Sequence, residues 1–217
     1  MTRFDFRARS FATALSGLAG FVDAIGFLTL GGFFVSFMSG NTTRLGVGLA
    51  ENPGDAAIAA ALILTFILGV MLGSWLGYRA GHRRPRAILL LMTGLLAASA
   101  LADSDGRHWL AAGLLALAMG AENAIFERDG DVQIGLTYMT GALVRFAQRL
   151  VAALMGVKNS GWQAFLLLWC GLALGAALGA TAWQVLGAPA LWIAVGFSAL
   201  LCLLAERAMA GTITRAV

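Results

Sequence analysis

Six apolar runs constrain the fold of this chain more than any other feature, because most of them are long enough to cross a lipid bilayer. A helix needs about 20 apolar residues to span the hydrocarbon core. Apolar residues make up 59% of the 217 residues and charged residues 12%, against about 45–50% and 25% in soluble domains. The sequence therefore predicts an all-α polytopic membrane protein with six transmembrane helices. The predicted spans are 11–30, 57–78, 87–101, 109–126, 165–186 and 190–205.

The basic residues lie in the gaps between these runs. If the N-terminus is cytoplasmic, all but two of the 15 lysines and arginines, Arg44 and Arg107, fall on the inner side. Short cytoplasmic loops are enriched in Lys and Arg. We therefore expect both termini to be cytoplasmic. This topology accounts for the pI near 9.8, so the expected partners are the lipid bilayer and a small-molecule solute, with no nucleic acid.

Two further segments, 33–49 and 134–157, are apolar enough to resemble spans. Full crossing of the first would move the arginines at 79–86 to the outer side, against the charge rule. We expect each segment to be a re-entrant or surface-lying helix after a break, at Gly31-Gly32 and at 127–131. Irregular backbone at membrane depth is tolerated where it is buried in protein or lines a wet cavity, so these segments are the expected lining of a site.

Three motifs occur twice in the same order, with offsets of 100 to 102 residues. The halves 1–106 and 107–217 each hold three predicted spans, and an odd number inverts the second half in the membrane. The sequence thus predicts one membrane domain of two inverted three-helix repeats, a plan that places transport sites at the repeat interface. The matched motifs are Gly20-x-x-Asp23-Ala24 with Gly120-x-x-Asn123-Ala124, Phe37-Met38-Ser39-Gly40-x-x-x-Arg44 with Tyr138-Met139-Thr140-Gly141-x-x-x-Arg145, and Gly69/Gly73/Gly77 with Gly171/Gly175/Gly179.

The two glycine stripes have a spacing of four residues, which places the glycines on one face of a helix. Small residues there let a second helix backbone approach closely, which favours helix association in lipid. Two interpretations stay open for these stripes. They either pack helices within one chain or form a homodimer through the Gly69/Gly73/Gly77 or Gly171/Gly175/Gly179 face.

Ionisable or polar side chains lie within two of the predicted spans: Asp23 in the first, and Glu122 with Asn123 in the fourth. An ionisable group inside the bilayer is costly and is a functional candidate by default. An acid in apolar surroundings has its neutral form favoured, which suits a proton carrier. The structural alternative is an ion pair with Arg44 or Arg145 that holds the two repeats together.

The small polar residues after Ser39 are the second group of candidates. Gly40, Asn41, Thr42 and Thr43 resemble a helix cap with free backbone amides, and a half-helix N-terminus attracts anions. Arg44 would add to this attraction, whereas plain capping of a surface helix is the alternative. The equivalents in the second half are weaker, so we expect the first half to carry more of the specificity. These equivalents are Gln133, Thr137, Thr140, Gly141 and Arg145.

No enzyme or cofactor signature accompanies these residues. The chain has no P-loop, zinc-ligand spacing, nucleophile elbow or dinucleotide fingerprint. Cys170 and Cys202 lie inside apolar runs, as small core residues do. We therefore expect no cofactor, no metal and no enzymatic activity.

The repeated motifs give the chain a family resemblance over nearly its whole length. In Gly20-x-x-Asp23-Ala24, Met38-Ser39-Gly40-Asn41 and Thr137-Tyr138-Met139-Thr140-Gly141 it resembles the YoaK-like family of small bacterial integral membrane proteins. The resemblance implies about six spans and a location in the bacterial cytoplasmic (inner) membrane. It implies no substrate.

These observations favour a secondary transporter or facilitator for a small polar or anionic solute, with proton coupling as an option. The acids would handle protons, and the residues from Gly40 to Arg44 would bind solute. One alternative is a membrane-embedded enzyme acting on a lipid-borne group. Another is a scaffold or assembly protein.

Overall fold

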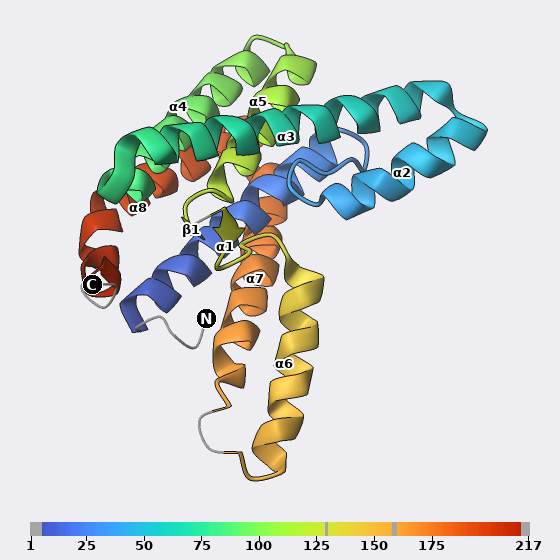
Figure 1. Cartoon of the computed structure of the whole chain (residues 1–217). Coiled ribbons are helices and arrows are strands. Elements are labelled where there is room, and N and C mark those ends of the chain that lie inside the picture. The colour runs from blue at the N-terminus through green and yellow to red at the C-terminus, as the bar shows by residue number, and fades with distance from the viewer. Residues whose placement is uncertain (1–5, 129, 158–159, 214–217) are drawn as a thin grey trace.

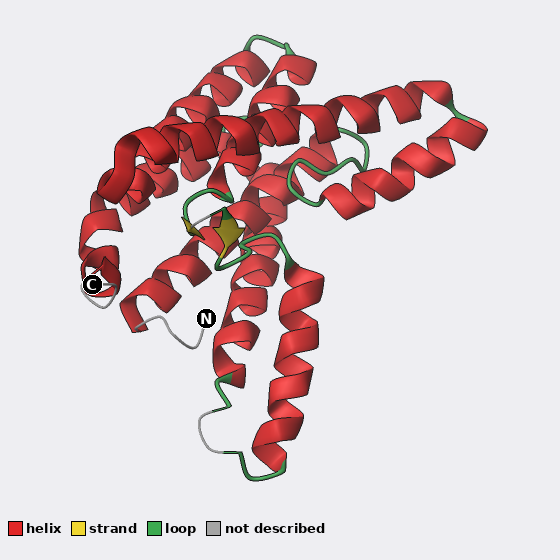
Figure 2. Cartoon of the chain, viewed as in Figure 1, coloured by secondary structure: helices red, strands yellow, loops and turns green. Residues whose placement is uncertain are grey.

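The computed structural model describes residues 6–128, 130–157 and 160–213, and the chain there is helical apart from one short antiparallel hairpin (Figures 1 and 2). Of the basic residues that support the predicted topology, Arg3, Lys158 and Arg215 lie outside the described residues. The elements in order are α1 (Phe6–Thr29), α2 (Met38–Glu51), α3 (Pro53–Ala80), the 3₁₀ helix η1 (Gly81–Arg83), α4 (Arg84–Ser104), α5 (His108–Glu122), β1 (Glu127–Arg128), β2 (Asp131–Val132), α6 (Met139–Leu154), α7 (Trp162–Leu186) and α8 (Ala190–Ile213).

Local sequence explains where the helices begin and end. Helix α1 ends before Gly31 and Gly32, whose φ angles of 64° and 98° lie in a region that only glycine adopts readily. Helix α3 begins at Pro53, and the Asn52 side chain accepts a hydrogen bond from the Gly54 amide at 3.0 Å. The predicted break at Gly31-Gly32 is therefore confirmed. The second break, predicted at 127–131, contains the β1–β2 hairpin, which the sequence did not predict.

The helices identify a polytopic membrane protein. Three stretches are long and apolar enough to cross a bilayer: Phe6–Thr29, Pro53–Ser104, which joins α3 to α4 through η1, and Trp162–Leu186. The apolar part Ala190–Glu206 of α8 is shorter. Helix α5 has only 15 residues and ends at Glu122, not at 126 as predicted, because the chain turns at 123–126. The number of complete crossings stays a prediction.

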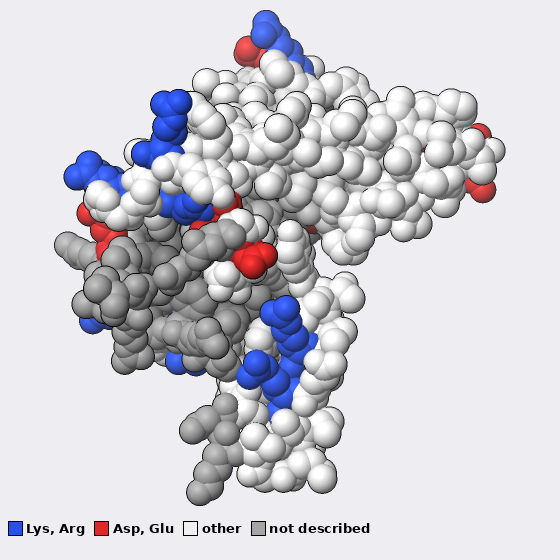
Figure 3. Space-filling model, viewed as in Figure 1, with Lys and Arg blue, Asp and Glu red and all other residues white. Residues whose placement is uncertain are grey.

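Apart from the basic side chains on α6, the charged side chains visible in Figure 3 gather near the ends of helices, and the long arm formed by α2 and α3 is almost free of them except at its tip. The acids nearest that tip in the sequence are Glu51 and Asp55, on either side of the α2–α3 turn. Helix flanks of this kind are typical of chains whose helix middles contact lipid.

The helices pack across the midpoint of the chain rather than within each half. Helix α1 packs along α7, and α5 packs along α3. Helix α4 contacts both α5 and α8, and α8 also contacts α1. Two hairpins, α2–α3 and α6–α7, extend as separate arms from this centre (Figure 1). Each half therefore contributes its first helix to a pair completed by the other half.

The glycine stripes lie at these two crossings. A Cβ on Gly69 or Gly73 would stand within 3.0 Å of the Cα atom of Leu117 or Ala121 on α5. A Cβ on Gly175 or Gly179 would stand 2.8 Å from the Cα atom of Gly17 or Phe21 on α1. The stripes thus serve packing within one chain, as one of the two interpretations proposed. A dimer through the same faces would require the two halves to separate.

These contacts also correct the alignment of the stripes. Since Leu117 and Gly17 differ by 100 in number, as do Ala121 and Phe21, the contacts match Gly69 with Gly175 and Gly73 with Gly179. The offset is therefore 106 residues and not 102. The motif alone could not fix this, because a glycine every four residues matches equally well after a shift of one helical turn.

Candidate functional site

A cavity of about 270 Å³, which we call the central cavity, lies where helices α2 and α6 begin. Its walls are residues 36–39, where the first break leads into α2, residues 137–141, where the second break leads into α6, and Phe66 of α3. Both sides contribute residues with hydroxyl groups, including Ser39 and Thr140. The ends of the two breaks therefore meet at one hollow, whose wall combines hydroxyl groups with apolar and aromatic side chains.

A second cavity of about 120 Å³ lies next to the first and shares Tyr138 and Gly141 with it. We call it the Arg145 pocket, because that guanidinium is the charged group in its wall. The remaining wall comes from the β2–α6 connection, α6 and α7, including Gln133 and Phe165. Figure 3 shows basic side chains on α6, whose basic residues are Arg145 and Arg149. Positive charge is thus concentrated beside the second half of the site.

Asp23 holds the first break in place and does not line either cavity. Its Oδ1 atom accepts hydrogen bonds from the amides of Val35 and Ser36, each at 2.8 Å. Backbone amides inside a protein must find acceptors, and one carboxyl oxygen of Asp23 serves both of these amides. Asp23 therefore positions Ser36, which does line the central cavity.

Asn123 does the equivalent work in the second half. Its Oδ1 atom accepts a hydrogen bond from the Thr137 hydroxyl at 3.2 Å, and its Nδ2 atom donates to the Met119 carbonyl at 3.0 Å. Thr137 lines the central cavity. The matched positions 23 and 123 thus both fasten the first helix of a half to the loop that follows it.

Asn41 is a structural clamp, which corrects the prediction that it caps a helix. It is fully buried, and its side chain pairs with both backbone groups of Phe34, at 3.0 Å to the amide and 2.6 Å to the carbonyl. Helix α2 begins three residues earlier at Met38, and its N-cap, Phe37, makes no side-chain capping bond. The polar run 39–43 forms part of the first turns of the helix instead of preceding it.

Thr42 and Thr43 line neither cavity. Both are exposed, and their hydroxyls donate to the carbonyls of Met38 and Ser39 at 2.8 and 3.3 Å. Such bonds to the carbonyl four residues back are common for hydroxyls within helices. The prediction that the first half carries more of the specificity is not matched by the cavity walls, where the second half contributes more residues.

The two arginines do not pair with the two acids. The Arg44 guanidinium lies 4.6 Å from the centre of the Phe33 ring, and that of Arg145 lies 5.9 Å from the centre of the Phe165 ring. Neither makes an ion pair with Asp23 or Glu122 within the described part of the chain. The structural alternative, an acid–arginine ion pair between the repeats, is therefore not formed among the described residues, and both arginines lie against aromatic rings.

The two matched glycines differ in the space beside them. A Cβ on Gly40 would meet the rings of Phe34 and Phe37, with Phe34 at 2.8 Å. A Cβ on Gly141 would meet no atom within 4 Å. The start of α2 is thus filled by its own aromatic residues, whereas the start of α6 is open to both cavities.

Glu122 is the most isolated acid among the residues that the structure describes. Its side chain is fully buried, and neither carboxyl oxygen has a hydrogen-bond partner. Nearly all buried polar groups in folded proteins are hydrogen-bonded, so an exception requires an explanation. Glu122 lines neither of the two cavities.

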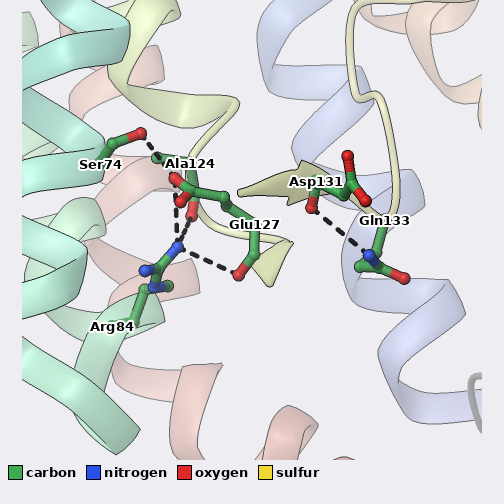
Figure 4. A network of polar contacts seen from close by, with 6 residues as sticks. All are labelled: Ser74, Arg84, Ala124, Glu127, Asp131 and Gln133. Atoms are coloured by element: carbon green, nitrogen blue, oxygen red, sulfur yellow. Dashed lines mark hydrogen bonds and ion pairs between the residues drawn. The ribbon is translucent and has the colours of Figure 1, made fainter. Parts of the chain in front are cut away.

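A cluster around Arg84 was not expected from the sequence (Figure 4). Arg84 pairs with Glu127 at 3.2 Å and donates to the carbonyls of Glu127 at 3.0 Å and Ala124 at 3.4 Å. The Ser74 hydroxyl donates to Glu127 at 2.5 Å. Both charged side chains are largely buried, with 14% and 8% exposed. The cluster joins α3 and α4 to the turn that follows α5.

Gly77 has its explanation in this cluster. A Cβ there would lie 2.8 Å from the Nε atom of Arg84. The third glycine of the stripe therefore makes room for the Arg84 side chain, whereas the first two make room for helix α5. The sequence signal was present, since Arg84 and Glu127 both border apolar runs. The predicted topology assigned these residues only to loops.

No resident metal is indicated by the geometry. Across residues 6–128, 130–157 and 160–213, no group of three or more His, Cys, Asp and Glu side chains is placed to hold a metal ion. The chemistry that the cavities offer is binding by hydroxyl groups, by the open start of α6 and by the guanidinium of Arg145.

Comparison with known proteins gives the family. Residues 11–204 match the family described as protein of unknown function (DUF1275). The chain belongs to that family. It is also 44% identical over 180 residues to UPF0700 transmembrane protein RA0705 of Rhizobium meliloti (strain 1021), which covers 83% of this chain and 78% of that protein. No solved structure matches the chain. The resemblance to an uncharacterised family of membrane proteins is thereby confirmed for this DUF1275 member.

Proposed function

We propose that this DUF1275 protein is a secondary transporter or facilitator for a small polar or anionic solute, and that the central cavity is its binding site. One observation carries the proposal: the breaks of both halves meet at a cavity of about 270 Å³ with hydroxyls from each side. Non-helical backbone at membrane depth is tolerated where it lines such a cavity.

An inverted repeat, with six spans and a pseudo-twofold axis in the membrane plane, underlies this proposal. In its support, exchanging the halves turns the α1–α7 contact into the α5–α3 contact and the α2–α3 hairpin into the α6–α7 hairpin. The paired backbone contacts of Gly69 with Leu117 and of Gly175 with Gly17 obey the same exchange. Transporters with this plan bind solute near the bilayer midplane and move one repeat against the other.

The cavity walls favour an anion over a cation. The central cavity has hydroxyl groups but no charged side chain in its wall, and the adjoining pocket adds the guanidinium of Arg145. No Asp or Glu side chain of the described residues lines either hollow. The amide of Gly141 lies in the first turn of α6, where the helix dipole attracts negative charge.

Transport is favoured over catalysis by what the walls lack. A hydrolytic or transfer site needs a nucleophile beside a base. Ser36, Ser39 and the threonines offer hydroxyls, but no His, Asp, Glu or Lys of the described residues stands with them in the cavity walls. We place the protein in the bacterial inner membrane with both termini cytoplasmic.

The test is solute flux in proteoliposomes, using formate, nitrate and lactate as anions and glycerol and urea as neutral solutes. Gly141→Leu fills the shared wall of the two cavities without striking an atom within 4 Å of its Cβ. Gly46→Leu is the matched control, because it lies on α2, has equal space at its Cβ, and lines neither cavity.

We expect wild-type protein and Gly46→Leu to move at least one solute faster than protein-free liposomes, and Gly141→Leu to lose most of that flux. Flux equal to protein-free liposomes for every solute would overturn the proposal of transport. Equal flux through the wild type and Gly141→Leu would overturn the placement of the site.

A further inference from the structure

We infer that Glu122 is the proton-carrying residue of this protein and that Asp23, the other acid in the first helix of a half, is not. The inference rests on the proposed transport function and deepens it, because it assigns the coupled ion to one side chain. It separates two acids that the sequence left equal.

Glu122 is isolated inside the protein. The side chain is fully buried, and both carboxyl oxygens are without a hydrogen-bond partner. A carboxylate in apolar surroundings without a partner is far more costly than the neutral acid. A proton on one oxygen removes that charge, and the proton comes from water and returns to water.

The helices that pack against α5 are α1, α3 and α4. None of the titratable groups on the described parts of these helices makes a hydrogen bond or ion pair with Glu122. On α5 itself, His108 pairs with Asp103 at the opposite end of the helix. The groups considered are Arg7, Arg9 and Asp23 on α1, Asp55, Tyr78 and Arg79 on α3, and Arg84, Arg86 and Asp103 on α4.

The matched position in the first half shows whether helix packing requires a carboxyl group here. The residue matched to Glu122 is Val22, since Gly20 and Gly120 each lie against backbone of the partner helix and Asp23 matches Asn123. Val22 is also fully buried. The fold therefore accepts an apolar side chain at this position, so packing alone does not require a carboxyl at 122.

Glu122 lies next to Asn123, the residue that fastens α5 to the second break. The next residue, Asn123, holds Thr137, whose side chain belongs to the wall of the central cavity. A movement that brings the Glu122 carboxyl to water would displace this tether as well. Loading and release of the proton are thereby linked to the shape of the cavity.

Asp23 has the opposite character. Two backbone amides at 2.8 Å bind its Oδ1 atom. Its carboxyl group therefore already has partners inside the protein, whereas that of Glu122 has none. Asp23 holds the first break, which is the role of a positioning residue.

The experiment measures proton uptake and solute flux in proteoliposomes for wild type, Glu122→Gln and Asp23→Asn. Glu122→Val copies the matched residue and serves as a second variant with packing proven by the first half. Infrared spectra of the wild type and Glu122→Gln, recorded at neutral pH, report the carbonyl stretch of a protonated carboxylic acid without any need for transport.

We expect the wild type to show this infrared band and Glu122→Gln to lack it. We expect solute-driven proton uptake to fall at least tenfold in Glu122→Gln and Glu122→Val, and to persist in Asp23→Asn. A wild type without the band, or proton uptake that is unchanged in Glu122→Gln, would overturn the inference. Since the band does not depend on flux, failure of the transport proposal is distinguished from failure of this one.

Discussion

Both halves of the molecule line the central cavity, but different contacts hold the two breaks in place. In the first half, Asp23 binds two amides of the break, and the rings of Phe27 and Phe34 pack over it at 5.0 Å between centres. In the second half, Asn123 binds one hydroxyl, and the Arg84–Glu127 ion pair secures the chain further on. The first break is thus closed by its own residues, whereas the second is held from α3 and α4.

The two halves share their helix packing but not the polar residues at their breaks. In the helix crossings, Gly69 and Gly175 lie against backbone positions that match in the two halves. The open start of α6 and the charge of Arg145 both lie in the second half. Packing contacts are therefore alike in the two halves, whereas the candidate binding residues are not.

The largest effect is expected from breaking the fastening that only the second half has. Arg84→Ala leaves the largely buried Glu127 carboxylate without its cation, which costs about 3–5 kcal/mol of unfolding free energy. Unfolding in detergent, followed by circular dichroism, measures the loss. Adding Glu127→Ala should recover part of it, because the stranded charge is gone.

Arg86→Ala is the control for this experiment. Arg86 pairs with Glu206 at 2.8 Å on an exposed surface, where ion pairs contribute little, so stability should barely change. If Arg84→Ala were as mild as Arg86→Ala, the second break would not depend on its ion pair.

The next effect concerns the helix crossings, where the halves should behave alike. Gly69→Val and Gly175→Val each drive a side chain into the backbone of the partner helix, at Leu117 and Gly17. Overpacking of this kind costs about 1–3 kcal/mol. The drop in melting temperature in detergent should be similar for both, and Gly113→Val, with no atom within 4 Å of its Cβ, should show little. A drop in one stripe alone would break the proposed equivalence.

The matched tethers should differ in strength. Asp23→Ala leaves two buried backbone amides without their acceptor and should cost about 2–3 kcal/mol, whereas Asn123→Ala removes one hydroxyl contact and one helix contact and should cost about 1 kcal/mol. Hydrogen exchange at residues 33–37 and 133–137 measures the loosening of each break. Faster exchange confined to the break of the substituted half is the expected result. Equal losses would show that the two tethers are equally strong.

The smallest effect on stability, and a selective one on flux, is expected at the matched arginines. Arg145→Gln removes the charge beside the cavities and should weaken apparent anion affinity about tenfold, which corresponds to about 1.4 kcal/mol. Arg44→Gln should not change that affinity, because Arg44 lies on the Phe33 ring and lines neither cavity. Concentration dependence of anion flux distinguishes the two, and a reversed ranking would return the specificity to the first half.

Much of the fold could be predicted from patterns that act locally. Apolar length located the helices, Gly31-Gly32 located the first break, and the repeated motifs identified which breaks to compare. The end of α5 was predicted too late, because the apolar residues of 123–126 continue past Glu122 although their backbone turns. The hydropathy of such a segment predicts that it is buried, but it does not predict whether its backbone is helical or turned.

The site was harder to predict, because side-chain partners are set by tertiary packing. Asp23 and Arg44 carry opposite charges in one half, yet backbone amides bind the first and an aromatic ring the second. Asn41 is a residue type that often caps helices, but it lies inside a helix that starts at Met38. Arg84 and Glu127 are 43 residues apart, and nothing in the spacing of their motifs indicated that they meet.

The crossed pairing of α1 with α7 has a consequence for how the protein is made. Helix α1 leaves the ribosome roughly 150 residues before α7, a delay of roughly 10–30 s at ordinary rates of synthesis. During that time the face of α1 that holds Gly17 and Gly20 lacks its final neighbours on α7, so newly inserted α1 should depend on the insertion machinery or a chaperone to keep its orientation in the membrane. Ribosomes stalled before residue 162 would hold a chain in which α1 still lacks α7, and α1 should be sensitive to proteases in that chain.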